Sequence, residues 1–205
     1  FQFIFCYFSF FVKVSDISVI LENFKFKEIT MVNKVAWITG AGSGIGEASA
    51  IKLSEEGFIV VLSGRTKEAL DTVASKCEGH ASVKPLDVSN SENVKGVFQN
   101  IISDYGRIDV LVASAGLNTK NRNWHNVSEE DFDQVIKIDL NGVFYTNRLV
   151  LEKMKEQREG LIINISSWAG KYVTTLTGPA YTAAKHGVNA LTEGINMEAG
   201  HFGVR

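Results

Sequence analysis

From residue 31 onward, short β-branched apolar runs alternate with longer amphipathic segments, and this alternation restricts the possible fold more than any other feature. The apolar runs cover residues 35–39, 58–63, 82–86, 110–113 and 161–165. The amphipathic segments cover residues 46–56, 67–76, 91–105, 129–156 and 181–199. Runs that are apolar on both faces are typical of strands inside a parallel sheet with helices on both sides. With right-handed crossovers, the sequence predicts an α/β fold with a doubly wound parallel sheet.

A glycine-rich segment follows directly after the first predicted strand and precedes the first predicted helix. Glycine there allows a tight turn, and it lets a pyrophosphate approach the N–H groups at the helix N-terminus. A purely structural turn is the alternative, because the spacing Thr-Gly-x-x-x-Gly-x-Gly differs from the usual Gly-x-Gly-x-x-Gly fingerprint. The strand before it and the helix after it favour phosphate binding. The candidate cofactor-binding residues of this turn are Thr39, Gly40, Ser43, Gly44, Ile45 and Gly46.

The ends of the second and third predicted strands indicate which dinucleotide would bind. An acidic residue after the second strand would hydrogen-bond the adenosine ribose of NAD. This chain has Gly64-Arg65 there, and an arginine can pair with a 2′-phosphate instead. We therefore expect NADP rather than NAD, with a solvated arginine at the start of a helix as the alternative. Asp87-Val88 could contact the adenine, whereas a helix-capping turn with Ser89 is the competing interpretation of Asp87.

Tyr181 and Lys185 are four residues apart in a predicted helix. That spacing places both side chains on one face, about 6 Å apart along the axis. A neighbouring cation favours the phenolate and lowers the pKa of a tyrosine, so the pair is a candidate proton donor. A lone Tyr-x-x-x-Lys also arises by chance, with the tyrosine in the core and the lysine in solvent.

Residues from about 32 to 205 resemble the short-chain dehydrogenase/reductase family, which has a Rossmann-type fold. The glycine-rich turn and Tyr181-x-x-x-Lys185 match its motifs, and residues 163–167, Ile-Asn-Ile-Ser-Ser, match the end of its fifth strand. The resemblance implies hydride transfer between a nicotinamide cofactor and a small-molecule carbonyl or alcohol. It implies that Tyr181 is the general acid or base, that Lys185 lowers its pKa and binds the nicotinamide ribose, and that Ser167 stabilises the substrate oxygen. Asp87-Val88 also matches the adenine-contacting pair.

Two departures from the family pattern concern the site. The family's Asn-Asn-Ala-Gly after the fourth strand is Ala113-Ser114-Ala115-Gly116 here. Ser114 can still hydrogen-bond, and Ala115 and Gly116 still allow close approach, so all three are cofactor-binding candidates. The family's active-site asparagine, which holds a water largely through its backbone, falls on Asp139. Asp139 is therefore a candidate catalytic residue, with a merely structural role as the alternative.

Two other functions compete with a carbonyl/alcohol oxidoreductase. Nucleotide-sugar epimerases and dehydratases share Tyr-x-x-x-Lys, but they usually have a Thr-Gly-x-x-Gly-x-x-Gly turn that this chain lacks. A non-catalytic cofactor-binding protein is the second alternative; the complete serine, tyrosine and lysine set argues against it, and Asp139 leaves it some room. The resemblance further implies a homodimer or homotetramer.

The overall charge gives no reason to expect binding to nucleic acid or to a membrane. The formal net charge is −2. Cys6 and Cys77 lack metal-ligand spacing, so we expect no metal site. Two free thiols are typical of a reducing compartment, and we expect a cytoplasmic protein.

The two ends of the chain differ from the rest. Residues 1–12 are almost wholly apolar, yet they are shorter than the roughly 20 residues of a spanning helix and lack signal-peptide features. We expect Met31 to be the natural start and residues 1–30 to be a non-native or disordered extension, with a membrane-proximal anchor as the alternative. Residues 31–205 form the predicted NAD(P)-binding domain. We expect it to be truncated at the C-terminus, because family members continue through two more strands.

Overall fold

A computed structural model describes residues 3–5, 11–13 and 34–205. At the N-terminus, β1 (Phe3–Phe5) and β2 (Phe11–Lys13) form a two-stranded antiparallel pair. The other residues of the 1–30 segment lie outside the described residues. The expected extension, and Met31 as the natural start, therefore stay predictions.

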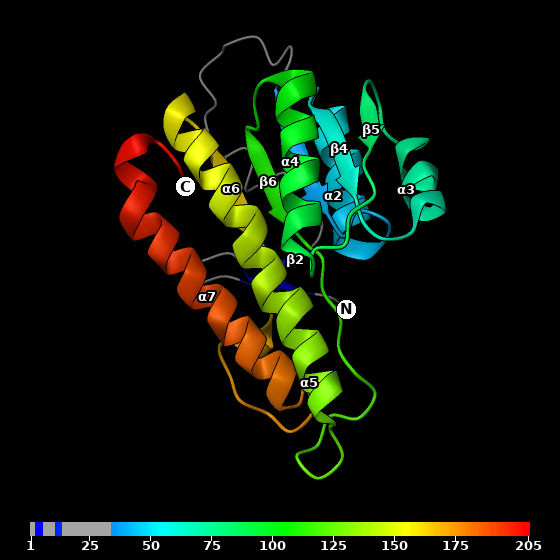
Figure 1. Cartoon of the computed structure of the whole chain (residues 1–205), viewed down its shortest axis with the longest axis vertical. Coiled ribbons are helices and arrows are strands. Elements are labelled where there is room, and N and C mark those ends of the chain that lie inside the picture. The colour runs from blue at the N-terminus through cyan, green and yellow to red at the C-terminus, as the bar shows by residue number, and fades with distance from the viewer. Residues whose placement is uncertain (1–2, 6–10, 14–33) are drawn as a thin grey trace.

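Five parallel strands form the central sheet (Figure 1). They are β3 (Val35–Thr39), β4 (Ile59–Ser63), β5 (Ala81–Val83), β6 (Val110–Ala113) and β7 (Leu161–Asn164). Their order is β5-β4-β3-β6-β7, so the chain builds outward from β3 in one direction and then in the other. This arrangement confirms the predicted doubly wound parallel sheet. The strand predicted over 82–86 is shorter than expected, although the Lys84 and Leu86 N–H groups still donate to the end of β4.

Helices cover both faces of the sheet (Figure 1). One face packs against α2 (Gly44–Glu55) and α3 (Lys67–Ala74), and the other against α4 (Ser91–Tyr105) and α6 (Gly142–Gln157). Successive side chains of a strand point to opposite faces, which explains why both layers are apolar. In β3, Ala36 and Ile38 join the core under α2 and α3, whereas Val35 and Trp37 join the core under α4 and α6.

The long helix predicted over 129–156 is present, and it contains a π-helical turn that the sequence did not indicate. It consists of α5 (Glu129–Ile136), the π-helix η2 (Lys137–Asn141) and α6. The Gly142 N–H donates to the Lys137 carbonyl, five residues earlier. The two α-helical parts have different neighbours, because Val135 of α5 packs against α7 and Met154 of α6 packs under the sheet. Such π turns are frequent at functional sites.

The last long helix, α7 (Pro179–Ala199), lies beside α5, η2 and α6 (Figure 1). Two short 3₁₀ helices flank it, η3 (Trp168–Gly170) before and η4 (Gly200–Phe202) after. Beyond η4, Val204 forms a parallel bridge with Gly160 at the start of β7. The Ile162 N–H also donates to the Arg205 carbonyl at 2.7 Å. Residues 204–205 thus lie beside the start of β7.

A buried carboxylate stabilises the end of the sheet where β3 and β6 begin. Asp109 is fully buried, and its Oδ2 accepts from the Val35 N–H at 2.8 Å and from the Arg107 Nε at 2.9 Å. Nearby, the Lys34 ammonium pairs with Glu159 at 2.8 Å. These polar contacts lie at the end of the sheet where the strands begin. The candidate site lies at the opposite end, where the strands finish.

Candidate active site

The turn after β3 requires glycine at two of its positions. Gly40 has a φ of +64°, and a Cβ there would lie 2.7 Å from the Ala115 backbone nitrogen. A Cβ at Gly46 would lie 2.2 Å from the Gly40 carbonyl oxygen. Both distances are far below van der Waals contact. The turn therefore packs directly against the segment after β6 and against the first turn of α2.

A single hydroxyl joins the carboxyl ends of β3 and β6. Thr39 Oγ1 accepts from the Ser114 N–H at 3.2 Å and from the Ala115 N–H at 3.3 Å. These neighbouring strands are where the strand order reverses direction. In doubly wound sheets, ligands bind in the crevice at this switch point. The sequence did not indicate this supporting contact of Thr39, because its partners are 75 and 76 residues away.

A cleft of about 300 Å³ opens at this switch point. Seven of the residues predicted to bind cofactor line it: Gly40, Ser43, Arg65, Asp87, Val88, Ala115 and Gly116. The cleft lining does not include the other predicted residues of the turn, Thr39, Gly44, Ile45 and Gly46, or Ser114. Leu117 and Ile138 also line the cleft, and no sequence motif identified them. A second cleft of about 300 Å³ shares Arg65, Asp87 and Ile138 and extends to Glu130, Asp133 and Lys137.

Arg65 and Asp87 lie at the same end of the cleft. Arg65 is exposed, and it forms no ion pair with any acidic side chain in the described part of the chain. Asp87 Oδ1 accepts from the Ser89 N–H at 3.0 Å and from the Ser89 hydroxyl at 2.7 Å. The competing turn of Asp87 with Ser89 is therefore present, but Asn90 is the residue that caps α4. Asp87 makes this turn and lines the cleft at once.

α7 carries Tyr181 and Lys185 at its start, where Pro179 occupies the first turn. Lys185 is buried, and its Nζ lies 5.4 Å from the centre of the Tyr181 ring. The same Nζ donates to the Ile165 carbonyl at 3.0 Å, just after β7. The lysine is therefore fixed beside the phenol and does not extend into solvent. The alternative of a solvated lysine does not describe this structure.

Asp139 lies in the π-helix η2 and is fully buried. Its Oδ1 accepts from the Leu117 N–H at 2.8 Å. Its Oδ2 lies 3.3 Å from the Lys185 Nζ, within ion-pair distance but without hydrogen-bond geometry. Burial raises the pKa of the Asp139 carboxyl above its ordinary value, and the Lys185 ammonium and the Leu117 N–H oppose that rise. Asp139 thus connects the cleft wall to the lysine of the Tyr181 pair.

Ser167 is the N-cap of η3 at the end of the β7 segment. Its Oγ accepts from the Ala169 N–H at 3.2 Å, and the side chain is partly exposed. The adjacent Ser166 is buried, and its hydroxyl lies 3.4 Å from the Lys185 carbonyl, which places the β7 end against α7. Because the Ser167 oxygen acts as the acceptor in this hydrogen bond, the hydroxyl proton of Ser167 remains available for donation to another group.

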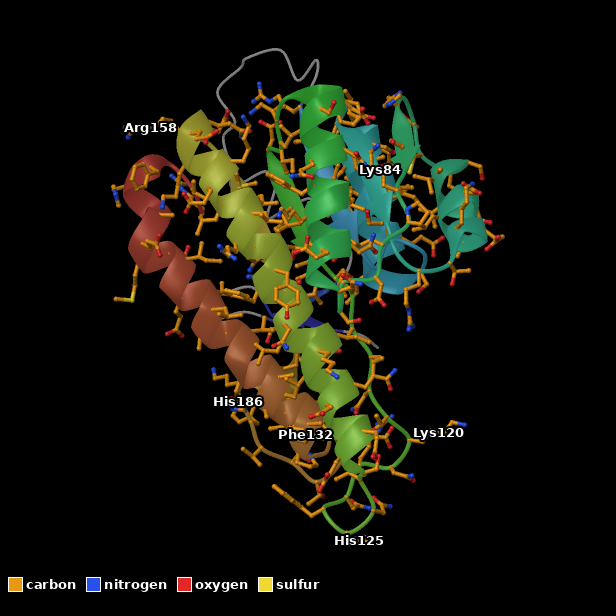
Figure 2. All side chains as sticks on the ribbon, viewed as in Figure 1. Lys84, Lys120, His125, Phe132, Arg158 and His186 are labelled. Atoms are coloured by element: carbon orange, nitrogen blue, oxygen red, sulfur yellow. The ribbon has the colours of Figure 1, made fainter. Side chains whose placement is uncertain are left out.

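The histidines lie away from this constellation. Figure 2 shows His125 at the tip of the loop before α5 and His186 on α7, and both are exposed. The His186 Nδ1 lies 2.9 Å from the Thr182 carbonyl. Among the described residues, no group of three or more histidine, cysteine or acidic side chains could hold a metal ion. No helix within that same part of the chain is long and apolar enough to cross a membrane.

Comparison with known proteins gives a consistent family. Residues 34–205 match the family model described as short chain dehydrogenase. An uncharacterized oxidoreductase of Staphylococcus aureus (strain USA300) is 38% identical over 178 residues, which are 85% of this chain and 75% of that protein. A metagenomic short-chain oxidoreductase solved in complex with NADP superposes with a TM-score of 0.82 at 34% identity, covering 86% of this chain and 81% of that one. NAD⁺-bound xylitol dehydrogenase gives a TM-score of 0.80 at 31% identity, covering 86% and 69%.

The family model extends over the described domain from residue 34 to residue 205. The solved relatives agree with the doubly wound parallel sheet. The chain belongs to the short-chain dehydrogenase family of oxidoreductases.

Proposed function

We propose that this protein transfers a hydride between a nicotinamide cofactor and a small-molecule carbonyl or alcohol, with Tyr181 as the proton donor or acceptor. The observation that carries the proposal is the fixed position of Lys185. Its ammonium is buried, held by the Ile165 carbonyl, and 5.4 Å from the Tyr181 ring centre. A cation held there stabilises the phenolate, which makes the phenol a better acid at neutral pH.

Neither Tyr181 nor Lys185 lines the cleft, but a series of contacts connects the cleft wall to this pair. Leu117 lines the cleft, and its N–H bonds to Asp139, which in turn contacts Lys185. Leu117 and Tyr181 also pack against the same buried cluster beneath α7. These contacts support a ligand that extends from the cleft past Leu117 toward the phenol.

Each residue has a separate role in the proposed reaction. The bound nicotinamide supplies the hydride in reduction or accepts it in oxidation. Tyr181 gives its hydroxyl proton to the carbonyl oxygen in reduction and takes it back in oxidation. Lys185 holds a positive charge beside the phenol and binds the nicotinamide ribose. The Ser167 hydroxyl donates to the substrate oxygen and stabilises its developing charge. Asp139 is proposed as a further member of this site.

The cleft fits a dinucleotide at both of its ends. The N–H groups at the start of α2 would bind the pyrophosphate, and Asp87 and Val88 would contact the adenine. We propose NADP as the preferred cofactor, because Arg65 is exposed at the adenine end and can pair with a 2′-phosphate. One relative was solved with NADP and another with NAD⁺, so the relatives support a nicotinamide cofactor of either kind.

The test measures NADPH and NADH consumption against a panel of aldehydes and ketones. Tyr181→Phe removes one hydroxyl and should lower turnover by about 10²–10⁴-fold, the usual contribution of a general acid. NADPH binding, followed by fluorescence, should stay nearly unchanged. The matched control is Tyr105→Phe on α4, which removes a hydroxyl that lies 3.0 Å from the His80 Nε2 and should leave turnover intact. Undiminished turnover in Tyr181→Phe would refute the assignment.

A further inference from the structure

The π-helix η2 contributes residues to both ends of the candidate site. Its Asp139 is buried and lies 3.3 Å from the Lys185 Nζ, whereas Lys137 and Ile138 face the clefts at the adenine end. Ile138 lines both clefts, and Lys137 lines the second one alone. Asp139 and Ile138 thus have neighbours in the site already described. The charged end of Lys137 is the part of η2 that still needs an explanation.

Lys137 and Arg65 bring two positive charges to the second cleft. Both side chains are exposed, and neither forms an ion pair with an acidic side chain in the described part of the chain. Asp133 lies four residues before Lys137, a spacing that often allows an ion pair on a helix, and it lines the same cleft. The two charged groups nevertheless do not pair. The Lys137 ammonium is therefore available to a ligand.

The acidic side chains of the second cleft restrict the kind of anion that it can bind. Asp87, Glu130 and Asp133 line it, so three carboxylates accompany the two cations. Asp87 already accepts two hydrogen bonds from Ser89, and Glu130 and Asp133 are exposed, where salt screens their charge. A free inorganic anion therefore gains little there. An anionic group on a larger ligand differs, because the rest of the ligand holds it at a high local concentration.

We propose that Lys137 is a second cation for the 2′-phosphate of NADP, acts together with Arg65, and strengthens the preference for NADP over NAD. This inference rests on the proposed binding of a dinucleotide in the switch-point cleft. Arg65 and Asp87 line both clefts, so a phosphate on an adenosine beside Asp87 can reach Arg65 from the second cleft. A phosphate monoester carries a charge of about −1.5 to −2 at pH 7, which one guanidinium neutralises only in part. Lys137 supplies the second positive charge from η2.

The decisive variant is Lys137→Met, which removes the ammonium and keeps an unbranched side chain. Dissociation constants of the full chain for NADPH and for NADH are measured by fluorescence titration at physiological ionic strength, without substrate. Ion pairs between exposed groups are weaker than buried ones, so we expect the NADPH constant to rise about 3–10-fold. The NADH constant should stay within about a factor of two, because NADH lacks the 2′-phosphate. A rise of less than about threefold for NADPH, or an equal rise for NADH, would overturn the proposal.

The matched control is Lys153→Met on α6, which makes the same charge change away from the clefts. Lys153 pairs with Glu156 at 3.5 Å, and Figure 1 shows α6 continuing along the direction of α5. Lys153 follows Lys137 by 16 residues, so it lies roughly 24 Å further along the helix axis. That distance exceeds the Debye length of about 8 Å, so both dissociation constants should stay unchanged. An equal loss of NADPH affinity in this variant would assign the effect to net charge and would overturn the proposal.

Two further variants separate the charge of Lys137 from its shape. Lys137→Arg keeps a positive charge at the same position and should retain the preference for NADPH over NADH. If Lys137→Arg lost that preference as fully as Lys137→Met, the charge would not be the cause, and the proposal would be overturned. If Lys137→Met does not fold, Lys137→Gln makes the same charge change with a polar side chain, and the same outcomes apply to it.

The results also separate this inference from the proposed function, because the titrations need no turnover. A chain that distinguishes NADPH from NADH through Lys137 but reduces no carbonyl would refute the proposed hydride transfer alone. A chain that reduces carbonyls and binds NADPH equally well with Lys137→Met would refute the role of Lys137 alone. A parent chain that binds no NADPH would overturn both.

Discussion

Gly46→Ala tests whether the glycine-rich turn is shaped by close backbone contact. The added Cβ would lie 2.2 Å from the Gly40 oxygen, 2.7 Å from the Gly40 carbonyl carbon and 3.0 Å from the Ala41 Cα. All three are backbone atoms, so the start of α2 must move away from the turn by about 1 Å. Overpacking of this severity lowers the free energy of unfolding by about 3 kcal/mol. The better helix propensity of alanine offsets about 1 kcal/mol of that loss.

The expected net loss is therefore about 2 kcal/mol, which lowers the melting temperature by about 4–8 °C for a chain of this size. The displaced helix start should also weaken NADPH binding, because the N–H groups that we propose bind the pyrophosphate belong to it. Thermal unfolding followed by circular dichroism measures the first effect, and fluorescence titration with NADPH measures the second.

Gly96→Ala is the matched control, because it makes the same change inside α4. No atom lies within 4 Å of the added Cβ there, so only the helix propensity changes. We expect this variant to be about 0.5–1 kcal/mol more stable than the parent chain. If Gly46→Ala were as stable as Gly96→Ala and bound NADPH normally, close contact would not be the reason for glycine at position 46.

Two further predictions concern the ends of the sheet. Arg65→Ala should raise the dissociation constant for NADPH about 10–100-fold and leave that for NADH unchanged, because charge-assisted bonds to a phosphate contribute about 1.5–3 kcal/mol. Tighter binding of NADH than of NADPH by the parent chain would contradict the expected cofactor preference. Asp109→Asn should lower the free energy of unfolding by about 1–3 kcal/mol in urea titrations, because the Arg107 guanidinium loses its buried partner. A urea midpoint equal to that of the parent chain would show that this contact contributes nothing.

The sheet could be predicted from sequence because its strands are apolar on both faces. In β3, Val35 and Trp37 serve one core while Ala36 and Ile38 serve the other, so no residue of the strand needs to be polar. The edge strand β5 was the least well predicted, because all three of its residues are only partly buried and the apolar signal is weak.

The π turn at Lys137–Asn141 could not be predicted in the same way. A π turn needs only one extra residue per turn, and the apolar pattern of α5 continues into α6 with no proline and with only Gly142 at the junction. Position 139 could be identified by family resemblance. The ion pair of Asp139 with Lys185 could not, because it depends on how η2 and α7 pack across 46 residues of sequence.

The hydroxyl of Thr39 has a kinetic consequence. Because Thr39 Oγ1 already holds the Ser114 and Ala115 N–H groups, the floor of the cleft is ordered before any ligand arrives. A preorganised surface loses little conformational entropy on binding. The association rate of the cofactor should therefore be limited by diffusion and orientation, and not by a slow closure of the cleft floor. Differences in affinity between NADP and NAD would then arise mainly from how long each stays bound. Arg65, at the exposed end of the cleft, would act as the residue that sets the residence time.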